Sequence, residues 1–184
     1  TSLGDRFLAE VFYGSILSRE EGVGVVAHRG NRLLGFVVGA YPAGRWYQSL
    51  VSTHRTEFVR SALGRLSEGP TALVELAEVG VAMLQGSSDP TGFPADLGYI
   101  AVEEEARGLG LGRRLVKRFL EALAARGASG CWTKTYATNT AARKLYERSG
   151  FKMLGRRRIR RIWSVYYGIE LAAQTSTSPS PSRR

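Results

Sequence analysis

The sequence contains few of the residues that build cross-links and metal sites. Its single cysteine is Cys131, and its two histidines, His28 and His54, stand far apart in the chain. One cysteine cannot form an intramolecular disulfide, and no Cys-x-x-Cys or paired-histidine spacing offers the ligand set of a structural zinc site. We therefore predict no bound metal, and this low cysteine content is typical of a cytoplasmic protein.

Long apolar runs are also missing. The best candidate, TALVELAEVGVAML, is interrupted by Glu75 and Glu78 and is shorter than the ~20 residues of a membrane-spanning helix. The first residues show no basic-then-apolar leader, and they start at Thr1 without a methionine. We predict no association with a membrane, and we expect that the start of the natural protein is not included.

Acidic residues are outnumbered by basic ones. The chain has 16 Asp and Glu against 26 Lys and Arg and a formal net charge of +10, and its only lysines are Lys117, Lys134, Lys144 and Lys152. An arginine-rich charge raises nucleic acid as a partner. Two other interpretations stay open. The charge either reflects the overall composition of a solvated face, which we favour, or serves a polyanionic cofactor.

The spacing of apolar residues predicts one α/β domain over residues 1–171, with a mixed sheet and helices on both faces. Residues 172–184 are rich in Ser, Thr and Pro, which predicts a disordered tail. Strands are expected over residues 22–30, 31–41, 95–102, 130–136, 151–161 and 162–171, the first two as a hairpin. Helices are expected over residues 5–18, 45–66, 71–85, 113–126 and 138–150.

Glycine is concentrated where a strand meets a helix, in YIAVEEEARGLGLGRRLVKRF, at Gly108, Gly110 and Gly112. The first amides of a helix lack internal partners and carry positive potential, and glycine lets an oxygen-rich group approach them closely. With Arg107 and Arg113 on either side, this turn predicts a phosphate or pyrophosphate site. Neither the GxGxxG fingerprint nor the GxxxxGK[ST] fingerprint fits the sequence here.

Two motifs, in the right order, resemble the GNAT superfamily of acyl-CoA-dependent N-acetyltransferases. The first is R-x-x-G-x-G, from Arg107 to Gly112, after a strand that ends in IAV. The second, NTAARKLYERSGF, is similar to the family's N-x-x-A-x-x-x-Y-x-x-x-G-F signature at Asn139, Ala142, Tyr146, Gly150 and Phe151. The resemblance is close over about residues 96–158, and it extends less specifically to the hairpin GVVAHRGNRLLGFVVG.

The resemblance implies a GNAT-like fold, with a mixed, mostly antiparallel sheet, splayed central strands and helices on both faces. It implies acetyl-CoA as the cosubstrate, with the pantetheine between the strand that ends at Val102 and the strand GCWTKTY. The residues implied in binding it belong to the strand end, the turn and the start of the later helix. They are Ile100, Ala101, Val102, Arg107, Gly108, Leu109, Gly110, Leu111, Gly112, Arg113 and Asn139.

The same resemblance implies transfer of an acetyl group to a primary amine of a small molecule or protein by direct attack. The oxyanion needs a hydrogen-bond donor, for which the Val102 amide is the candidate. Tyr146 is the candidate acid, because a phenol with a pKa of ~10 stays protonated at neutral pH and can donate to the departing thiolate. Glu103 is the first candidate base, with a water relay as the alternative. Cys131 is expected to pack in a strand.

The sequence departs from the family pattern in two places. No strand precedes the first expected helix, which strengthens the expectation of a missing start. Residues 41–95 read as a helical insert where the family has a short connection. This insert is expected either to shape the acceptor pocket or to serve as structural cover.

Acetyl transfer is the function that the sequence favours most, and two other functions are compatible with it. One is a non-catalytic acyl-CoA-binding regulatory module. The other, less favoured, is a nucleic-acid-binding protein that uses Arg156–Arg161. Alternation along a strand would divide those arginines between two faces, and charge on an edge strand also limits aggregation. The acceptor is not identified by the sequence, and a monomer or homodimer is expected.

Overall fold

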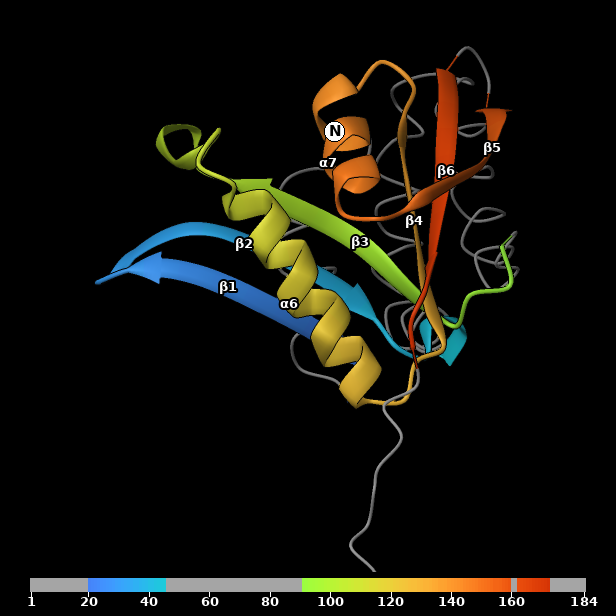
Figure 1. The fold of residues 1–184 in the computed structure, drawn as a ribbon, viewed down its shortest axis with the longest axis horizontal. Helices are drawn as coiled ribbons and strands as arrows, with labels where there is room; N and C mark the ends of the chain where they lie inside the picture. Colours follow the sequence, from blue (N-terminus) through green and yellow to red (C-terminus); the bar gives the residue numbers. More distant parts are fainter. Residues whose placement is uncertain (1–19, 46–90, 160–161, 173–184) are drawn as a thin grey trace, which may run out of the picture.

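The computed structural model describes residues 20–45, 91–159 and 162–172 (Figure 1). In chain order the elements are β1 (Gly22–Arg29), β2 (Arg32–Ala40), β3 (Ala95–Val102), the 3-10 helix η3 (Glu104–Ala106), α6 (Leu111–Ala125), β4 (Gly130–Tyr136), α7 (Thr140–Arg148), β5 (Lys152–Ile159) and β6 (Ile162–Glu170). The helices expected over residues 5–18, 45–66 and 71–85 lie outside the described residues, except for Arg45, and so does most of the expected tail.

The strands form one sheet in the order β1-β2-β3-β4-β6-β5. All neighbouring strands are antiparallel except β3 and β4, which run parallel. The prediction of a mixed, mostly antiparallel sheet is therefore confirmed. Three strands carry an extra residue in their ladders, Leu34 in β2, Gly98 in β3 and Leu154 in β5, and each bulge changes which side chains face which side of the sheet.

Helix α6 lies across β1, β2 and β3, and α7 lies on the same side of the sheet near β4 and β6 (Figure 1). Glycine is required in β2 because both β3 and α6 approach it closely. A Cβ atom on Gly35 would lie 2.8 Å from the Ala101 carbonyl oxygen and 3.2 Å from Leu115 Cδ1, and one on Gly39 would overlap the Asp96 carbonyl oxygen and lie 2.7 Å from Phe119 Cζ. Leu115 and Phe119 are themselves buried in the core, so this packing fixes α6, and with it the turn before α6, against the sheet.

The predicted helix over 113–126 begins two residues earlier, at Leu111. The reason is that Gly110 adopts a left-handed conformation with φ 75° and serves as the N-cap, which lets the helix start directly after it. The helix predicted over residues 138–150 corresponds to α7, which begins at Thr140 with Asn139 as its N-cap. Among the described helices, none has both the length and the apolar character that crossing a membrane demands.

Candidate functional site

The central gap of the sheet lies between the parallel strands β3 and β4. Their ladder ends at the pair Asp96–Trp132, and the two strands then diverge (Figure 1). Where they part, the Thr133 hydroxyl donates to the Leu97 carbonyl oxygen over 2.8 Å, so a side chain takes the place of the next ladder bond. The part of the chain that the structure describes has no β3–β4 ladder pair beyond this point.

The end of β3 directs main-chain groups into this gap. The Glu103 amide donates to the Leu34 carbonyl oxygen on the β2 side, over 2.9 Å. Successive residues of a strand direct their N–H and C=O groups to alternate edges. Ala101 therefore also directs its peptide groups toward β2, whereas Ile100 and Val102 direct theirs toward the gap. The diverging strands thus leave an edge of β3 without a neighbouring strand among the described residues, which an extended, amide-containing molecule can pair with.

The turn after β3 presents main-chain amides at the N-terminus of α6. Gly108 and Gly110 have positive φ values of 77° and 75°, a conformation that L-residues adopt only with strain. The N-cap Gly110 supplies no side-chain hydrogen bond, and no acidic side chain lies in the first turn. Arg114 is the first residue whose amide bonds within the helix, to the Gly110 carbonyl oxygen at 3.1 Å. The three preceding amides therefore suit an anion.

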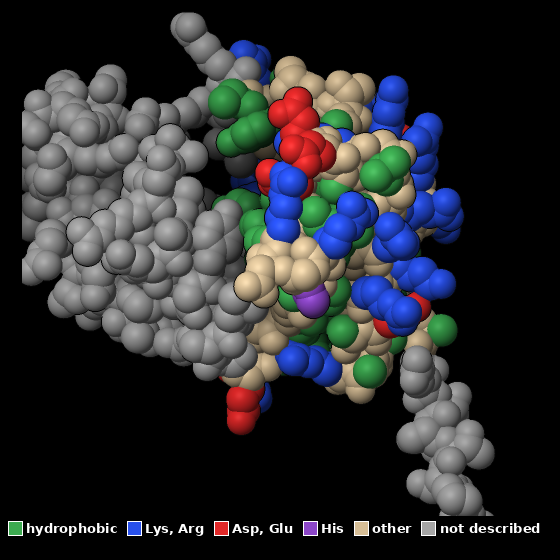
Figure 2. Space-filling model, turned by 90° about the vertical axis from the view of Figure 1, so that its left-hand side faces the viewer, with side chains coloured by type: hydrophobic (Ala, Val, Ile, Leu, Met, Phe, Trp, Pro, Cys, Tyr) green, Lys and Arg blue, Asp and Glu red, His purple; other side chains and the backbone are tan. Residues whose placement is uncertain are grey.

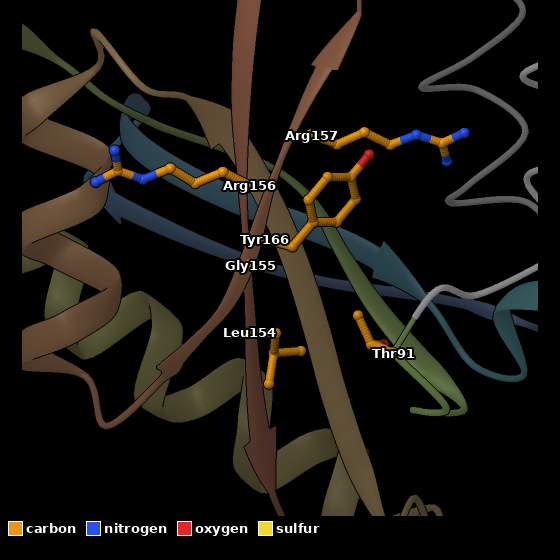
Figure 3. Close-up of a pocket in the computed structure, with 6 residues that line it drawn as sticks. All are labelled: Thr91, Leu154, Gly155, Arg156, Arg157 and Tyr166. Atoms are coloured by element: carbon orange, nitrogen blue, oxygen red, sulfur yellow. The ribbon is translucent and has the colours of Figure 1, made fainter.

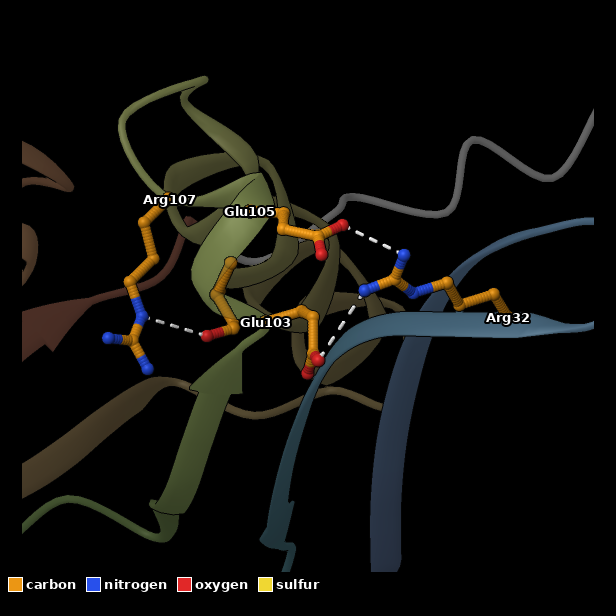
Figure 4. A network of polar contacts seen from close by, with 5 residues as sticks. Arg32, Glu103, Glu105 and Arg107 are labelled. Atoms are coloured by element: carbon orange, nitrogen blue, oxygen red, sulfur yellow. Dashed lines mark hydrogen bonds and ion pairs between the residues drawn. The ribbon is translucent and has the colours of Figure 1, made fainter.

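A network of charges fixes the base of this turn (Figure 4). The Arg107 Nε atom donates to the Val102 carbonyl oxygen over 3.1 Å. Arg32, from the end of the hairpin, lies 2.8 Å from a Glu105 carboxylate oxygen and 3.7 Å from one of Glu103. The hydrogen bond and charge of Arg32 lower the pKa of Glu105 below its ordinary value. All of these carboxylates and guanidinium groups are exposed to solvent, so the network orients the turn more than it stabilises the fold.

Tyr146 reaches the point where β3 and β4 part. Its side chain is 4% exposed, and its ring packs against those of Phe151 and Tyr167, each with a centroid distance of 5.8 Å. Its hydroxyl hydrogen-bonds the Thr133 side chain, and burial raises the pKa of the phenol above its ordinary value. Since the Thr133 hydroxyl donates to Leu97, Tyr146 is linked to both strands that border the gap.

Helix α7 is held in place at both ends. Asn139 Oδ1 accepts a hydrogen bond from the Ala142 amide over 3.1 Å and so caps the helix. On the side facing β6, the Tyr167 hydroxyl donates to Glu147 over 2.9 Å and accepts from Arg143 Nε at 3.3 Å. These contacts tie α7 to the sheet and fix the position from which Tyr146 extends.

The structure brings together the strand end, the turn and the start of α6 around the gap, with the Tyr146 hydroxyl at its closed end. Glu103 is placed differently, because its carboxylate is paired with Arg32 beside β2. Asn139 is exposed at the start of α7. Cys131 is buried, and burial raises the pKa of its thiol well above its ordinary value, which agrees with the expected packing role.

Two residues of β4 were missed in the sequence analysis. Thr133 closes the end of the gap, and Lys134 follows it on the opposite face of the strand. The protein around Lys134 desolvates its ammonium group and lowers its pKa below the ordinary value, while the charge of Asp96 opposes this effect. The alternating pattern of GCWTKTY was the signal that separates their two faces.

Comparisons with known proteins agree with this geometry. The family model "Acetyltransferase (GNAT) family" matches residues 3–151 of the chain. Among solved structures, SsHAT is similar at 24% identity and a TM-score of 0.62, with 90% of this chain and 80% of that chain covered.

Two further structures share the fold. The ribosomal-protein-S18-alanine N-acetyltransferase from Escherichia coli is 16% identical with a TM-score of 0.56, covering 93% of this chain and 81% of that one. A Bacillus anthracis protein assigned to streptothricin acetylation, solved with acetyl coenzyme A, is 16% identical with a TM-score of 0.54, covering 87% and 68%. A search of curated proteins gave no match.

Proposed function

Since the chain belongs to the GNAT acetyltransferase family, we propose that it transfers an acetyl group from acetyl-CoA to a primary amine of a small molecule or protein by direct attack. The observation that carries this proposal is the gap between β3 and β4 beside an α6 N-terminus without a side-chain cap. The gap suits an extended acyl-pantetheine, and the uncapped amides suit a diphosphate.

Different residues around the gap would bind different parts of acetyl-CoA. The peptide groups of Ile100 and Val102 would pair with the pantetheine amides as a neighbouring strand does. The segment from Arg107 to Arg113 would hold the diphosphate, with the amides of α6 as donors and two guanidinium groups as flanking charge. Asn139 caps α7 beyond the open end of β4, about two helical turns from Tyr146, so it would border the pantetheine and not the thioester.

The chemistry then needs three groups. As the amine attacks the thioester carbonyl, negative charge develops on its oxygen and needs a hydrogen-bond donor. The Val102 amide, the candidate from the sequence, lies five residues along β3 from Leu97, to which Tyr146 is linked through Thr133, so a main-chain amide of β3 closer to Tyr146 is the better placed donor. The C–S bond breaks and the electron pair leaves with sulfur, which Tyr146 would protonate from its hydroxyl. The raised pKa of Tyr146 favours this role, because the phenol stays protonated when the amine attacks.

The third group takes the proton of the amine. Glu103 directly follows the strand end, but its carboxylate is paired with Arg32 on the β2 side. Asp96 is buried, and its carboxylate accepts the Ala40 amide at 3.1 Å, which is a structural role. This geometry favours a water relay over Glu103 as the proton acceptor.

Calorimetry with acetyl-CoA, followed by a thiol-release assay with a panel of amines, tests the proposal. We expect the protein to bind acetyl-CoA and CoA, and to release thiol faster when an accepted amine is present. A protein that binds neither ligand would refute the assignment. Binding without amine-dependent thiol release would identify the chain as a non-catalytic acyl-CoA-binding module.

A further inference from the structure

A hollow of about 220 Å³ lies beside β5 and β6. It is lined by Thr91, Leu154, Gly155, Arg156, Arg157 and Tyr166 (Figure 3). Arg157 and Tyr166 extend to the same side of the strands, whereas Arg156 points the opposite way, toward α7 (Figure 3). The register agrees, because Arg157 pairs with Ser164, two residues from Tyr166, and Arg156 pairs with the buried Val165. The hollow therefore lies on the face opposite α7.

The Arg157 guanidinium is available for a ligand. Within the described residues it takes part in no hydrogen bond or ion pair, and none of the six lining residues is acidic. Arg157 lies beside the Tyr166 hydroxyl, and no carboxylate lines the hollow with them. Together the guanidinium and the hydroxyl form a set of hydrogen-bond donors that matches carboxylate or phosphate oxygens.

The donors continue from the hollow toward the gap. Tyr166 is the register partner of Lys134 on β4, so the two side chains share a face. The Trp132 ring stacks on Tyr166 with a centroid distance of 6.3 Å. Trp132 is 6% exposed, yet its indole N–H has no hydrogen-bond partner among the residues that the structure describes. Because a buried N–H without a partner is costly, this donor points to an acceptor atom on a ligand.

We call Trp132, Lys134, Tyr166 and Arg157 the donor strip. It crosses from β4, at the border of the gap, to β5 two strands away, and adjacent strands are ~4.8 Å apart. A molecule that lies along the strip would place one end at the gap and the other about 10 Å away, at Arg157. Asp96 lies at the β4 end of the strip, where it is the register partner of Trp132. Its carboxylate is close enough for its charge to act on Lys134.

We propose that the donor strip binds the acceptor of the transfer reaction, and that this acceptor is a primary amine carrying a carboxylate or phosphate group. Its amine lies at the gap, and its anionic group binds Arg157. This inference rests on the proposed acetyl transfer. The net charge of +10 is consistent with it, because a positive field raises the local concentration of an anionic substrate.

Matched acceptors test the charge preference. Thiol release is measured with 4-(aminomethyl)benzoate, with 4-(aminomethyl)phenyl phosphate, and with the neutral 4-(aminomethyl)benzamide, at one ionic strength. We expect kcat/KM to be about tenfold higher for at least one anionic amine than for the amide, since a charge-assisted hydrogen bond contributes about this factor. The preferred anion distinguishes a carboxylate acceptor from a phosphate acceptor.

Matched variants then test the site. In Arg157→Gln the preference for the anion should fall to about one, through KM more than kcat. Arg158→Gln removes the same charge from the same strand, but Arg158 pairs with Trp163 on the other face, so this variant should keep the preference. Equal turnover of charged and neutral amines, or equal effects of the two substitutions, would refute the donor strip as the acceptor site. Neither result would contradict the proposal of acetyl transfer.

Direct binding separates this inference from the proposed function. Calorimetry of the same three amines is carried out on protein saturated with CoA, with no turnover needed. Tighter binding of an anionic amine that is lost in Arg157→Gln and kept in Arg158→Gln supports the site even if no amine is acetylated. If the dissociation constant does not depend on the charge of the amine, the proposed acceptor site is refuted.

Discussion

The hydroxyl of Tyr146 owes its chemistry to its surroundings. The ring is buried between Phe151 and Tyr167, and the hydroxyl contacts Thr133. Burial disfavours the phenolate, so the pKa is raised and the folded protein holds the proton beyond the pH at which a free tyrosine, with a pKa of ~10, would lose it. Ionisation of Tyr146 should therefore not limit turnover anywhere near neutral pH.

Removal of this hydroxyl should slow the chemical step. In Tyr146→Phe we expect kcat for thiol release to fall by about 100-fold, the usual contribution of a general acid, while the dissociation constant of CoA changes by less than about twofold. Tyr41→Phe is the matched control, because Tyr41 packs against the core at the end of β2. Unchanged turnover in Tyr146→Phe would exclude the phenol as the acid.

The proton acceptor can be tested at a second residue. Glu103→Gln keeps the size of the side chain and removes its charge, and a water relay predicts that kcat changes by less than about threefold. A general base contributes at least about 100-fold. A loss of that size, with a change in the acidic limb of the pH profile, would show that Glu103 takes the proton despite its pairing with Arg32.

Among the elements, the turn before α6 combines a strained backbone conformation with the proposed diphosphate site. Gly110 ends the turn in a left-handed conformation, and the helix starts at the next residue. A side chain at this position would meet no neighbouring atom within 4 Å. The requirement for glycine therefore comes from the backbone angle and not from packing.

Substitution of this glycine should affect stability and binding together. Gly110→Ala should lower the free energy of unfolding by about 1 kcal/mol, because alanine adopts positive φ at that cost. It should also weaken CoA binding, as the strained turn moves the amides. Gly44→Ala is the control, since Gly44 has open space around it and is absent from the positive-φ glycines. Thermal unfolding and calorimetry measure the two effects, and identical behaviour of the variants would contradict this account.

Local patterns predicted some elements better than others. The strands over residues 95–102 and 130–136 were predicted with the observed bounds, because apolar residues flanked by turns define a strand locally. The hydrogen bond from Thr133 to Leu97 was not predicted, because it depends on two strands meeting and then diverging. The bulge at Leu154 shifts the register of β5 by one residue, so the face that Arg157 occupies could not be read from alternation alone.

At the scale of the whole molecule, positive charge is in excess. On the face drawn in Figure 2, the Lys and Arg side chains of the described residues cover much of the surface, with acidic side chains in one cluster toward the top and others near the lower edge. Neighbouring arginines of β5 leave the strand in opposite directions (Figure 3), as the sequence analysis expected.

Binding of acetyl-CoA should stabilise the whole fold in a salt-dependent way. At 100 times the dissociation constant, a ligand that binds only the folded state adds about 2.7 kcal/mol to the free energy of unfolding. Added salt should reduce the shift in Tm, because it screens the guanidinium groups beside the diphosphate site. Pantetheine, which has no diphosphate, is the control and should give a smaller shift that salt leaves unchanged. Equal salt sensitivity for both ligands would argue against a diphosphate site at the turn.

The gap and the donor strip differ in how they respond to mutation. The groups that Ile100 and Val102 direct into the gap are peptide N–H and C=O groups, which every amino acid except proline retains. The donor strip consists of side chains, each of which a single nucleotide change can replace. Evolution could thus alter the choice of acceptor one codon at a time while the grip on the acyl donor persists, so close homologues of this chain should diverge in acceptor sooner than in cosubstrate.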